Sequence, residues 1–203
     1  MTSSPSETSE APDTEGHETE APDPLADYAR GVLEAVSGVD SSADFGTVKI
    51  RVDAANWVDA LTKARDELGL IFFSWLSAVD WANDVAVGGA PEDPVEERYE
   101  ILCALSDLST GRLVVFSADI DKESATIDSL VDVFAGANWH EREAAEMFGI
   151  TFTGHPELAK LYLPDAFEGH PLQKSYPLLS REVKPWPGKV DVEDMPTTEN
   201  PEA

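Results

Sequence analysis

Apolar residues recur every three or four positions in several parts of the chain, which is the spacing of helices with one buried face. The first such helix is expected to begin at Pro24, with Asp23 as its N-cap and Gly38 at its end. In the second helix, Trp57 and Leu61 lie on the apolar face. The four helices expected on this basis run from Pro24 to Gly38, from Asp53 to Gly69, from about Ser129 onward, and from Trp139 to Phe148.

Between these helices, apolar and polar residues alternate, which is the pattern of strands with one buried side. Four strands are expected, at residues 47–52, about 70–81, 98–108 and 112–120. The short connection Ser109-Thr110-Gly111 predicts that the last two strands form an antiparallel hairpin. Residues 37–46 and the glycine- and proline-rich residues 83–95 are expected to be loops.

This order of elements predicts an α+β domain over residues 24–152, with helices packed on a mixed, mainly antiparallel sheet of about four strands. Prolines are frequent beyond Ile150 and break any long regular element, so residues 153–187 are expected to form an extended arm. Residues 1–23 and 188–203 are acidic and poor in apolar residues. Such segments bury too little apolar surface to fold, so both are expected to be flexible tails.

The charge balance narrows the range of partners. The 203 residues include 40 acidic and 14 basic side chains, which gives a formal net charge of -26. A field of this sign repels nucleic-acid phosphates and anionic membrane surfaces, and it favours encounter with a basic protein. The longest mainly apolar stretch, residues 68–79, is well short of the ~20 residues that span a bilayer. Any association with a membrane is therefore expected to be indirect.

Sequence motifs that hold cofactors or metals are missing. The one cysteine, Cys103, cannot supply the roughly four ligands of an iron–sulfur cluster. His140, His155 and His170 do not have the short spacing of metal ligands. The sequence also lacks a nucleophile elbow, a phosphate-binding loop and a dinucleotide fingerprint. We therefore expect no catalytic, cofactor-binding or metal-binding residue in this chain.

The densest polar group is His140-Glu141-Arg142-Glu143, followed closely by Glu146. On a helix, Arg142 and Glu146 are i,i+4 neighbours, while Glu143 and Glu146 are i,i+3 neighbours. The two carboxylates could share a proton and serve as acid and base in a hydrolase. An ion-pair network without catalysis is the favoured interpretation, because such networks also perturb pKa values. Six aromatic residues between positions 72 and 148 are expected to lie in the core: Phe72, Phe73, Trp75, Phe134, Trp139 and Phe148.

A longer motif surrounds this polar helix. Residues 137–150 read ANWHEREAAEMFGI, and they are followed by Gly154-His155-Pro156, by Leu163-Pro164-Asp165 and by GHPLQKSYPL at residues 169–178. In this order, the segments resemble the signature of the C subunit of the proton-pumping NADH-quinone oxidoreductase, respiratory complex I. The resemblance covers about residues 45–185. Two departures are Glu146, where the family usually has Asp, and Gln173, where it usually has a basic residue.

The resemblance implies a peripheral protein on the cytoplasmic face of the cell membrane. Electrons would pass from NADH through FMN and iron–sulfur clusters to quinone on partner subunits. The partners would be chiefly the D subunit at the quinone cavity and the B subunit at the terminal cluster, with no cofactor in this chain. Structural residues of the signature would be Trp139, Glu141, Arg142, Glu143, Glu146, Phe148, Gly149, Gly154, His155 and Pro156. Partner-docking residues in the arm would be Leu163, Pro164, Gly169, His170, Pro171, Leu172, Lys174, Tyr176, Pro177 and Trp186.

Trp186 has support of its own, because it lies between two prolines in a polar segment that offers no local core. An aromatic residue in such a place is expected to anchor in a partner's pocket. Other assignments stay open besides the hydrolase. The same kind of subunit could serve a membrane-bound hydrogenase or a dehydrogenase with another electron donor, since the donor binds elsewhere. The chain could also be an acidic interaction protein without a respiratory role.

Overall fold

The structure is a computed structural model that describes residues 23–86 and 91–177. Trp186 and most of both expected tails lie outside the described residues. In chain order the elements are α1 (Pro24–Val36), β1 (Asp40–Asp44), β2 (Thr47–Arg51), the 3₁₀ helix η1 (Ala54–Asn56), α2 (Trp57–Asp66), β3 (Phe72–Trp81), β4 (Arg98–Asp107), β5 (Arg112–Ile120), β6 (Thr126–Asp128), α3 (Ala137–Phe148) and β7 (Thr151–Thr153). This arrangement confirms the α+β class.

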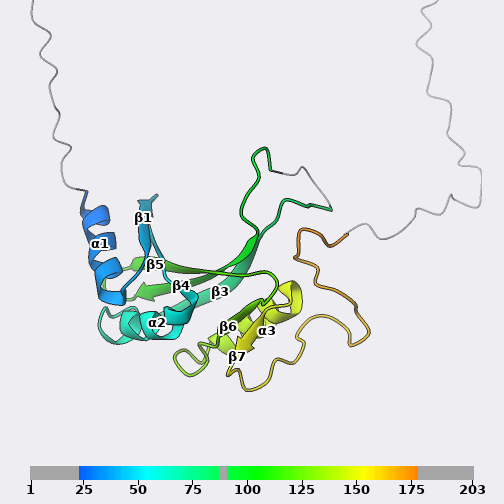
Figure 1. The fold of residues 1–203 in the computed structure, drawn as a ribbon. Helices are drawn as coiled ribbons and strands as arrows, with labels where there is room; N and C mark the ends of the chain where they lie inside the picture. Colours follow the sequence, from blue (N-terminus) through cyan, green and yellow to red (C-terminus); the bar gives the residue numbers. More distant parts are fainter. Residues whose placement is uncertain (1–22, 87–90, 178–203) are drawn as a thin grey trace, which may run out of the picture.

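The main sheet has five strands in the order β1-β2-β5-β4-β3 (Figure 1). β2 and β5 pair in parallel, and the other neighbours pair antiparallel, so the sheet is mixed and mainly antiparallel as expected. The expected hairpin is formed by β4 and β5. β6 and β7 form a separate parallel pair beside α3. In the described part of the chain, no helix is both long and apolar enough to cross a bilayer.

The core lies on one face of the sheet, which we call the inner face. α1 contributes Val32 and Val36 to it, and α2 contributes Trp57 and Leu61, all with almost no exposed surface. The helix start at Pro24 is confirmed, because the Asp23 carboxylate accepts a hydrogen bond from the Leu25 N–H at 2.9 Å. Apolar burial of this kind is the main force that holds helices on a sheet.

Three local expectations are wrong. Residues 40–44 form the edge strand β1 instead of a loop, because Phe45 and Gly46 take positive φ angles of 52° and 76° and make a tight two-residue hairpin turn. The side chain of Asp53 makes no capping hydrogen bond, and a 3₁₀ helix precedes α2. No helix begins at Ser129, because this segment folds into turns whose hydrogen-bond partners lie on α3.

The core assignment of the aromatic residues is partly wrong. Phe134 and Phe148 are buried, and Phe73 packs against the Phe134 ring at a centroid distance of 5.6 Å. Trp139, however, is 67% exposed, because it lies near the start of α3 on the side turned away from the core. Phe72 is half exposed and Trp75 half buried, and both lie on the opposite face of the sheet. Sequence alone does not tell which of two neighbouring aromatic residues on a strand points inward.

Candidate functional site

Helix α3 and the arm that follows it form the candidate site. α3 ends at Gly149, where φ is +80° and the N–H group donates to the carbonyl oxygen of Ala145. A Cβ atom at Gly149 would lie 2.8 Å from the Nε2 atom of His170 in the arm. Glycine is therefore needed both to end the helix and to let the arm pass closely.

Three residues spaced four apart on α3 contact the arm, and we call Asn138, Arg142 and Glu146 the clasp. The spacing places them along one side of the helix. The guanidinium of Arg142 donates to the backbone carbonyl oxygens of Ala159 at 2.7 Å and Lys160 at 3.3 Å. Arg142 and Glu146 therefore bind backbone groups of the arm, and among the described residues these two charged side chains make no ion pair with each other.

Glu146 makes the densest set of contacts in the clasp. Its carboxylate accepts hydrogen bonds from three successive N–H groups of the arm, those of Leu161 at 2.9 Å, Tyr162 at 3.0 Å and Leu163 at 2.6 Å. Burial opposes ionisation of this carboxyl group, but the three N–H donors and nearby Lys160 outweigh burial and lower its pKa. Glu146 is therefore ionised and fixed in place, which leaves it poorly suited to act as the acid of a hydrolytic pair.

His155 fixes the start of the arm on the first clasp residue. Its Nδ1 atom accepts a hydrogen bond from the Glu157 N–H at 3.0 Å, so the ring proton resides on Nε2. Nε2 lies 3.2 Å from the carbonyl oxygen of Asn138 and donates to it. The turn at Gly154-His155-Pro156 thereby joins the arm to the N-terminal half of α3.

The end of α3 holds the far part of the arm. His170 Nδ1 lies 2.8 Å from the backbone oxygen of Glu146, and the N–H of Leu172 donates to the backbone oxygen of Met147 at 3.1 Å. The side chain of Gln173 donates to the backbone oxygen of Phe148 at 2.7 Å. The carbonyl groups at a helix end lack partners within the helix, and here the arm supplies them.

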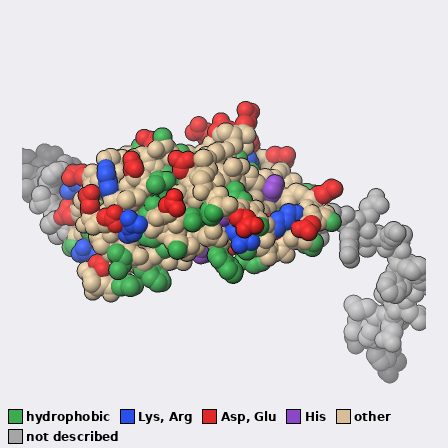
Figure 2. Space-filling view, turned by 90° about the horizontal axis from the view of Figure 1, so that it is seen from below, with side chains coloured by type: hydrophobic (Ala, Val, Ile, Leu, Met, Phe, Trp, Pro, Cys, Tyr) green, Lys and Arg blue, Asp and Glu red, His purple; other side chains and the backbone are tan. Residues whose placement is uncertain are grey.

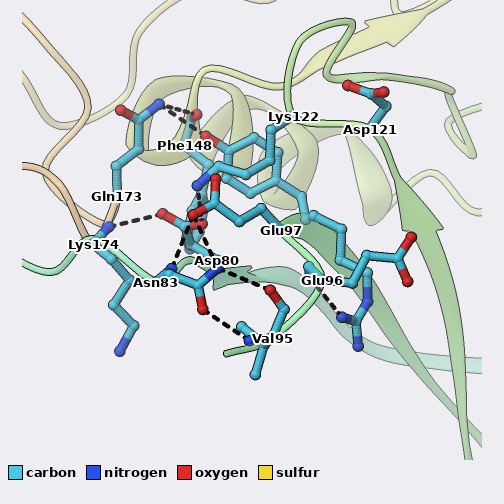
Figure 3. A network of polar contacts seen from close by, with 12 residues as sticks. Asp80, Asn83, Val95, Glu96, Glu97, Asp121, Lys122, Phe148, Gln173 and Lys174 are labelled. Atoms are coloured by element: carbon cyan, nitrogen blue, oxygen red, sulfur yellow. Dashed lines mark hydrogen bonds and ion pairs between the residues drawn. The ribbon is translucent and has the colours of Figure 1, made fainter. Parts of the chain in front are cut away.

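A second carboxylate, Asp80 at the end of β3, fixes the arm near Lys174 (Figure 3). Its side chain is 1% exposed and accepts hydrogen bonds from the Lys122 amine at 2.6 Å and from the Lys174 N–H at 2.8 Å. The Lys174 carbonyl in turn accepts from the N–H of Ala86. Asp80 therefore joins three segments that are far apart in sequence: β3, the loop after β5, and the arm.

Part of the arm also packs on itself. The rings of Phe167 and Tyr176 stack with centroids 6.1 Å apart. Gly169 lies beneath Tyr176, and a Cβ there would come within 2.8 Å of that ring. The Lys160 amine donates to the carbonyl oxygens of three residues, Pro164, Asp165 and Phe167. In its described part, the arm therefore has no helix or strand beyond β7, but its path is defined by contacts within the chain.

The opposite side of α3 carries a buried carboxyl group. Glu141 has no exposed surface, and it accepts hydrogen bonds from the Ser129 hydroxyl and the Leu130 N–H, both at 2.6 Å. Burial raises the pKa of Glu141 to about 7, although both hydrogen bonds act in the opposite direction. Burial likewise raises the pKa of the Cys103 thiol, and the Glu141 charge adds to this. Glu141 fixes the turn at residues 129–131 against α3.

We expect Glu141 to make the chain less stable as the pH rises from about 4.5 to about 7. Across this window the folded chain holds the Glu141 proton more tightly than the unfolded chain does, so stability falls with pH and levels off above it. The loss should approach 3 kcal/mol, at about 1.4 kcal/mol for each unit of pKa. Urea unfolding of wild type and Glu141→Gln at several pH values would measure it.

The Glu141→Gln variant serves as the matched control for this titration. Its amide can accept from the Leu130 N–H and donate to the Ser129 hydroxyl, so both contacts survive without an ionisable group. The difference in unfolding free energy between the two proteins should change with pH only between these two values. Parallel pH profiles would contradict the assignment.

The structure places the other expected residues at different depths. Leu163 and Pro171 are half buried, whereas Pro156, Pro164, Leu172 and Pro177 are exposed. Glu143 is half buried, and its carboxylate makes no hydrogen bond or ion pair with any described residue. Sequence reasoning missed Asp80 and Asn138. The only sequence pattern that pointed to Asp80 is its place as a charged residue at the end of an otherwise apolar stretch. The Asn138 contact uses a backbone oxygen, so no sequence pattern could indicate it.

Metal binding has no support in the described residues, which contain no group of three or more His, Cys, Asp or Glu side chains placed to hold an ion. His140, His155 and His170 each bond to a backbone oxygen, of Leu76, Asn138 and Glu146 respectively. The arrangement can therefore fix backbone segments, and within the described residues it shows no constellation suited to group transfer.

Comparison with known proteins gives consistent matches. A profile of the family described as respiratory-chain NADH dehydrogenase, 30 Kd subunit, matches residues 50–182. The C subunit of NADH-quinone oxidoreductase from Xanthobacter autotrophicus is 35% identical over 155 residues, which cover 75% of this chain and 69% of that protein. The C subunit from a Roseiflexus species is 34% identical over 145 residues, covering 70% of this chain and 77% of that protein.

Two solved structures share the fold. The trypsin-resistant fragment of Nqo5 aligns with a TM-score of 0.53 and 20% identity, covering 66% of this chain and 96% of the fragment. A chain of the membrane-bound sulfane sulfur reductase, an archaeal respiratory membrane complex, aligns with a TM-score of 0.62 and 19% identity, covering 76% of this chain and 86% of that one. At these identities the likeness is one of fold.

Proposed function

Because the chain belongs to the family of the 30 kDa subunit of respiratory-chain NADH dehydrogenase, we propose that it is a docking subunit of NADH-quinone oxidoreductase without a redox centre of its own. The enzyme complex as a whole moves electrons from NADH through FMN and iron–sulfur clusters to quinone. In this proposal the chain holds together the subunits that carry these groups and takes no electron itself.

The observation that carries the proposal is the way α3 fixes the arm. The arm has no regular structure, and hydrogen bonds define its path. These bonds are made by the clasp, His170, Gln173 and Asp80. Along this path large apolar side chains remain exposed, with Tyr162 at 63% and Leu172 at 50%, and Trp139 on α3 is 67% exposed. Because the backbone of the arm is already held in one path, less entropy is lost when these side chains bind a partner, which favours a docking surface.

The surface chemistry supports a protein partner. Figure 2 shows apolar side chains in separate groups among acidic and basic ones on the side of the molecule seen from below. Aromatic residues such as Trp139 and Tyr162 are typical anchors at protein interfaces. Following the family, we propose the D subunit at the quinone cavity and the B subunit at the terminal cluster as the partners, with the complex on the cytoplasmic face of the membrane.

The absence of a redox centre is part of the proposal and has physical support. Cys103 is fully buried in β4, where burial raises the pKa of its thiol and disfavours the thiolate that binds iron. A single thiol is also too few, because a cluster needs about four protein ligands. Visible spectroscopy and iron analysis of the purified full-length chain would test this, and bound flavin or iron would overturn it.

Affinity purification from membranes solubilised in mild detergent tests the docking role. The tagged full-length chain should recover the cluster-bearing and quinone-cavity subunits in fixed proportion. Recovery of the chain without any of these subunits, from cells in which they are present, would contradict the proposal. Chemical crosslinking of the recovered complex should join Lys160 or Lys174 of the arm to residues of the partner subunits.

Arg142→Ala is expected to lower the amount of assembled complex and to leave the turnover of each assembled complex unchanged. The variant loses two hydrogen bonds that fix residues 159–160, and it leaves the reacting groups on other subunits untouched. Native gels report the amount, and NADH oxidation per assembled complex reports the turnover. Arg30→Ala on α1 is the matched control, since Arg30 is exposed and its side chain bonds, among the described residues, only to Asp27. Normal assembly with slow turnover would be the contradicting result.

A second assignment has one observation in its favour, which is the shared fold with a chain of the sulfane sulfur reductase complex. The equivalent subunit of a membrane-bound hydrogenase or of a dehydrogenase with another donor would use the same docking surface. Donor preference of purified membranes separates the two. Quinone reduction that depends on NADH and on this chain favours the first assignment, and dependence on another donor favours the second.

A further inference from the structure

The face of the main sheet opposite the core is covered by no described helix or strand, and we call it the outer face. α2 and α3 lie on the inner side of the sheet (Figure 1). The strand register assigns the outer face, since residues paired across strands point to the same side. One row across the sheet joins Trp75, Ala104, Val115 and Lys49, and the next joins Ser77, Leu102, Ser117 and Arg51.

Half of this outer face is apolar. A sheet with one face in water usually alternates apolar inward residues with polar outward ones. Here the outward positions of β3, β4 and β5 carry large apolar side chains that are only half buried and belong to no part of the core cluster. We call these residues the outer patch: Trp75, Val79, Leu102, Leu113 and Val115. A continuous apolar patch on a soluble surface marks an interaction site.

The other half of the outer face carries no excess of positive charge. Lys49 pairs with Glu100, and Arg98 pairs with Asp119 at 3.0 Å. Arg51 lies 3.7 Å from the Asp119 carboxylate and 3.8 Å from that of Asp40. These basic groups are therefore neutralised within the chain, and they do not call for an acidic partner.

An acidic loop lies at one end of the outer face, beyond Trp81 and Arg98. The connection between β3 and β4 extends to the side of the sheet away from α2 and α3 (Figure 1). It carries five carboxylates that form no ion pair with any described residue: Asp84, Glu92, Asp93, Glu96 and Glu97. An apolar surface with acidic side chains at one end is complementary, in apolar character and in charge, to a segment that is apolar on one side and basic on its edge.

We propose that the outer patch docks a basic amphipathic helix of another subunit of the complex. The apolar side of that helix lies on Trp75, Leu102 and Val115, and its Lys or Arg side chains reach the acidic loop. The helix gives the sheet on its outer face the same kind of cover that the chain's own helices give the inner face. A second copy of this chain is a poor occupant, because two chains of net charge -26 repel each other. The proposal rests on membership of the complex and adds a surface separate from the arm.

Photo-crosslinking in cells tests the proposal. A photoreactive phenylalanine analogue at Val115 of the full-length chain reports the outer patch, and the same analogue at Tyr162 reports the arm. Phe45, fully exposed at the β1–β2 turn, is the control site. Mass spectrometry of the crosslinked peptides should identify, at Val115, a segment of another subunit with apolar residues at helical spacing and with Lys or Arg at its edge. Reversing the acidic loop with Glu92→Lys, Asp93→Lys and Glu96→Lys should reduce that crosslink about tenfold.

The crosslinks at Val115 and Tyr162 separate the outer patch from the arm. The charge-matched control Glu34→Lys, Asp59→Lys and Glu67→Lys, at sites on or beside α1 and α2, should leave the Val115 crosslink unchanged. Crosslinks from Val115 to this chain's own tails, to a second copy or to an acidic segment would overturn the proposal, and so would a yield no higher than at Phe45. Crosslinks from Tyr162 with none from Val115 would overturn only the outer patch. Crosslinks from neither site would count against the docking function itself.

Discussion

Glu146→Ala is expected to release the middle of the arm from α3 while the domain stays folded. The variant removes the acceptor of three backbone N–H groups, those of Leu161, Tyr162 and Leu163. Hydrogen bonds to a charged group contribute about 1.5–3 kcal/mol when well formed, and these backbone groups can turn to water instead. A net loss of about 2 kcal/mol should raise amide exchange in this segment about thirtyfold.

Hydrogen exchange of the purified chain measures this effect residue by residue. Glu143→Ala is the matched control, because Glu143 lies on the same helix and contacts no described partner through its carboxylate. Glu146→Gln keeps one acceptor oxygen and should fall between wild type and alanine. If exchange at residues 161–163 were equal in Glu146→Ala and Glu143→Ala, the clasp would not be what holds the arm. The same variant should lower complex assembly more than Arg142→Ala does.

Asp80→Ala is expected to have the largest effect on stability of any single change considered. The substitution leaves the Lys122 amine without its carboxylate and the Lys174 N–H without an acceptor. Breaking a buried pair by removing one partner costs about 3–5 kcal/mol, and the 24% exposure of the Lys122 side chain places this case toward the lower end of that range. Urea unfolding, with the midpoint shift converted through the slope, measures the loss.

A double-mutant cycle sharpens this second test. Adding Lys122→Ala to Asp80→Ala should recover part of the loss, because the stranded amine is then gone. Asp84→Ala, in the loop after β3 and free of ion pairs among the described residues, is the control and should change stability by less than about 0.5 kcal/mol. A cost for Asp80→Ala as small as that of Asp84→Ala would show that the network in Figure 3 contributes nothing.

The contacts explain why Glu and Gln serve at two positions of the signature. The Glu146 side chain reaches all three N–H groups of the arm. The Gln173 amide donates to the Phe148 carbonyl and to the Tyr99 hydroxyl. Both acceptors are neutral, so an amide satisfies them without a charge to bury.

Local patterns in the sequence were sufficient to predict the fold class and most of the elements. Helical spacing in residues 24–36 and alternation in residues 98–120 are local patterns, so α1 and the β4–β5 hairpin were predictable. The signature of residues 137–178 indicated the family, because so many fixed positions in one order specify a particular protein surface. Net charge argued against nucleic acids and anionic membranes as partners, and the single cysteine argued against an iron–sulfur cluster in this chain. Both are residue counts, which folding does not alter.

The tertiary structure alone decided where the arm runs and which groups hold it. Arg142 and Glu146 had the spacing to pair with each other, but each binds backbone groups of a segment some 15 residues away, and no side-chain pattern records a backbone partner. β1 forms from Ser and Asp residues of low strand propensity, because pairing with β2 outweighs that preference. The two faces of β3 and β4 likewise became distinct only when the helices covered one of them, which left Trp75 on β3 and Leu102 on β4 outside the core.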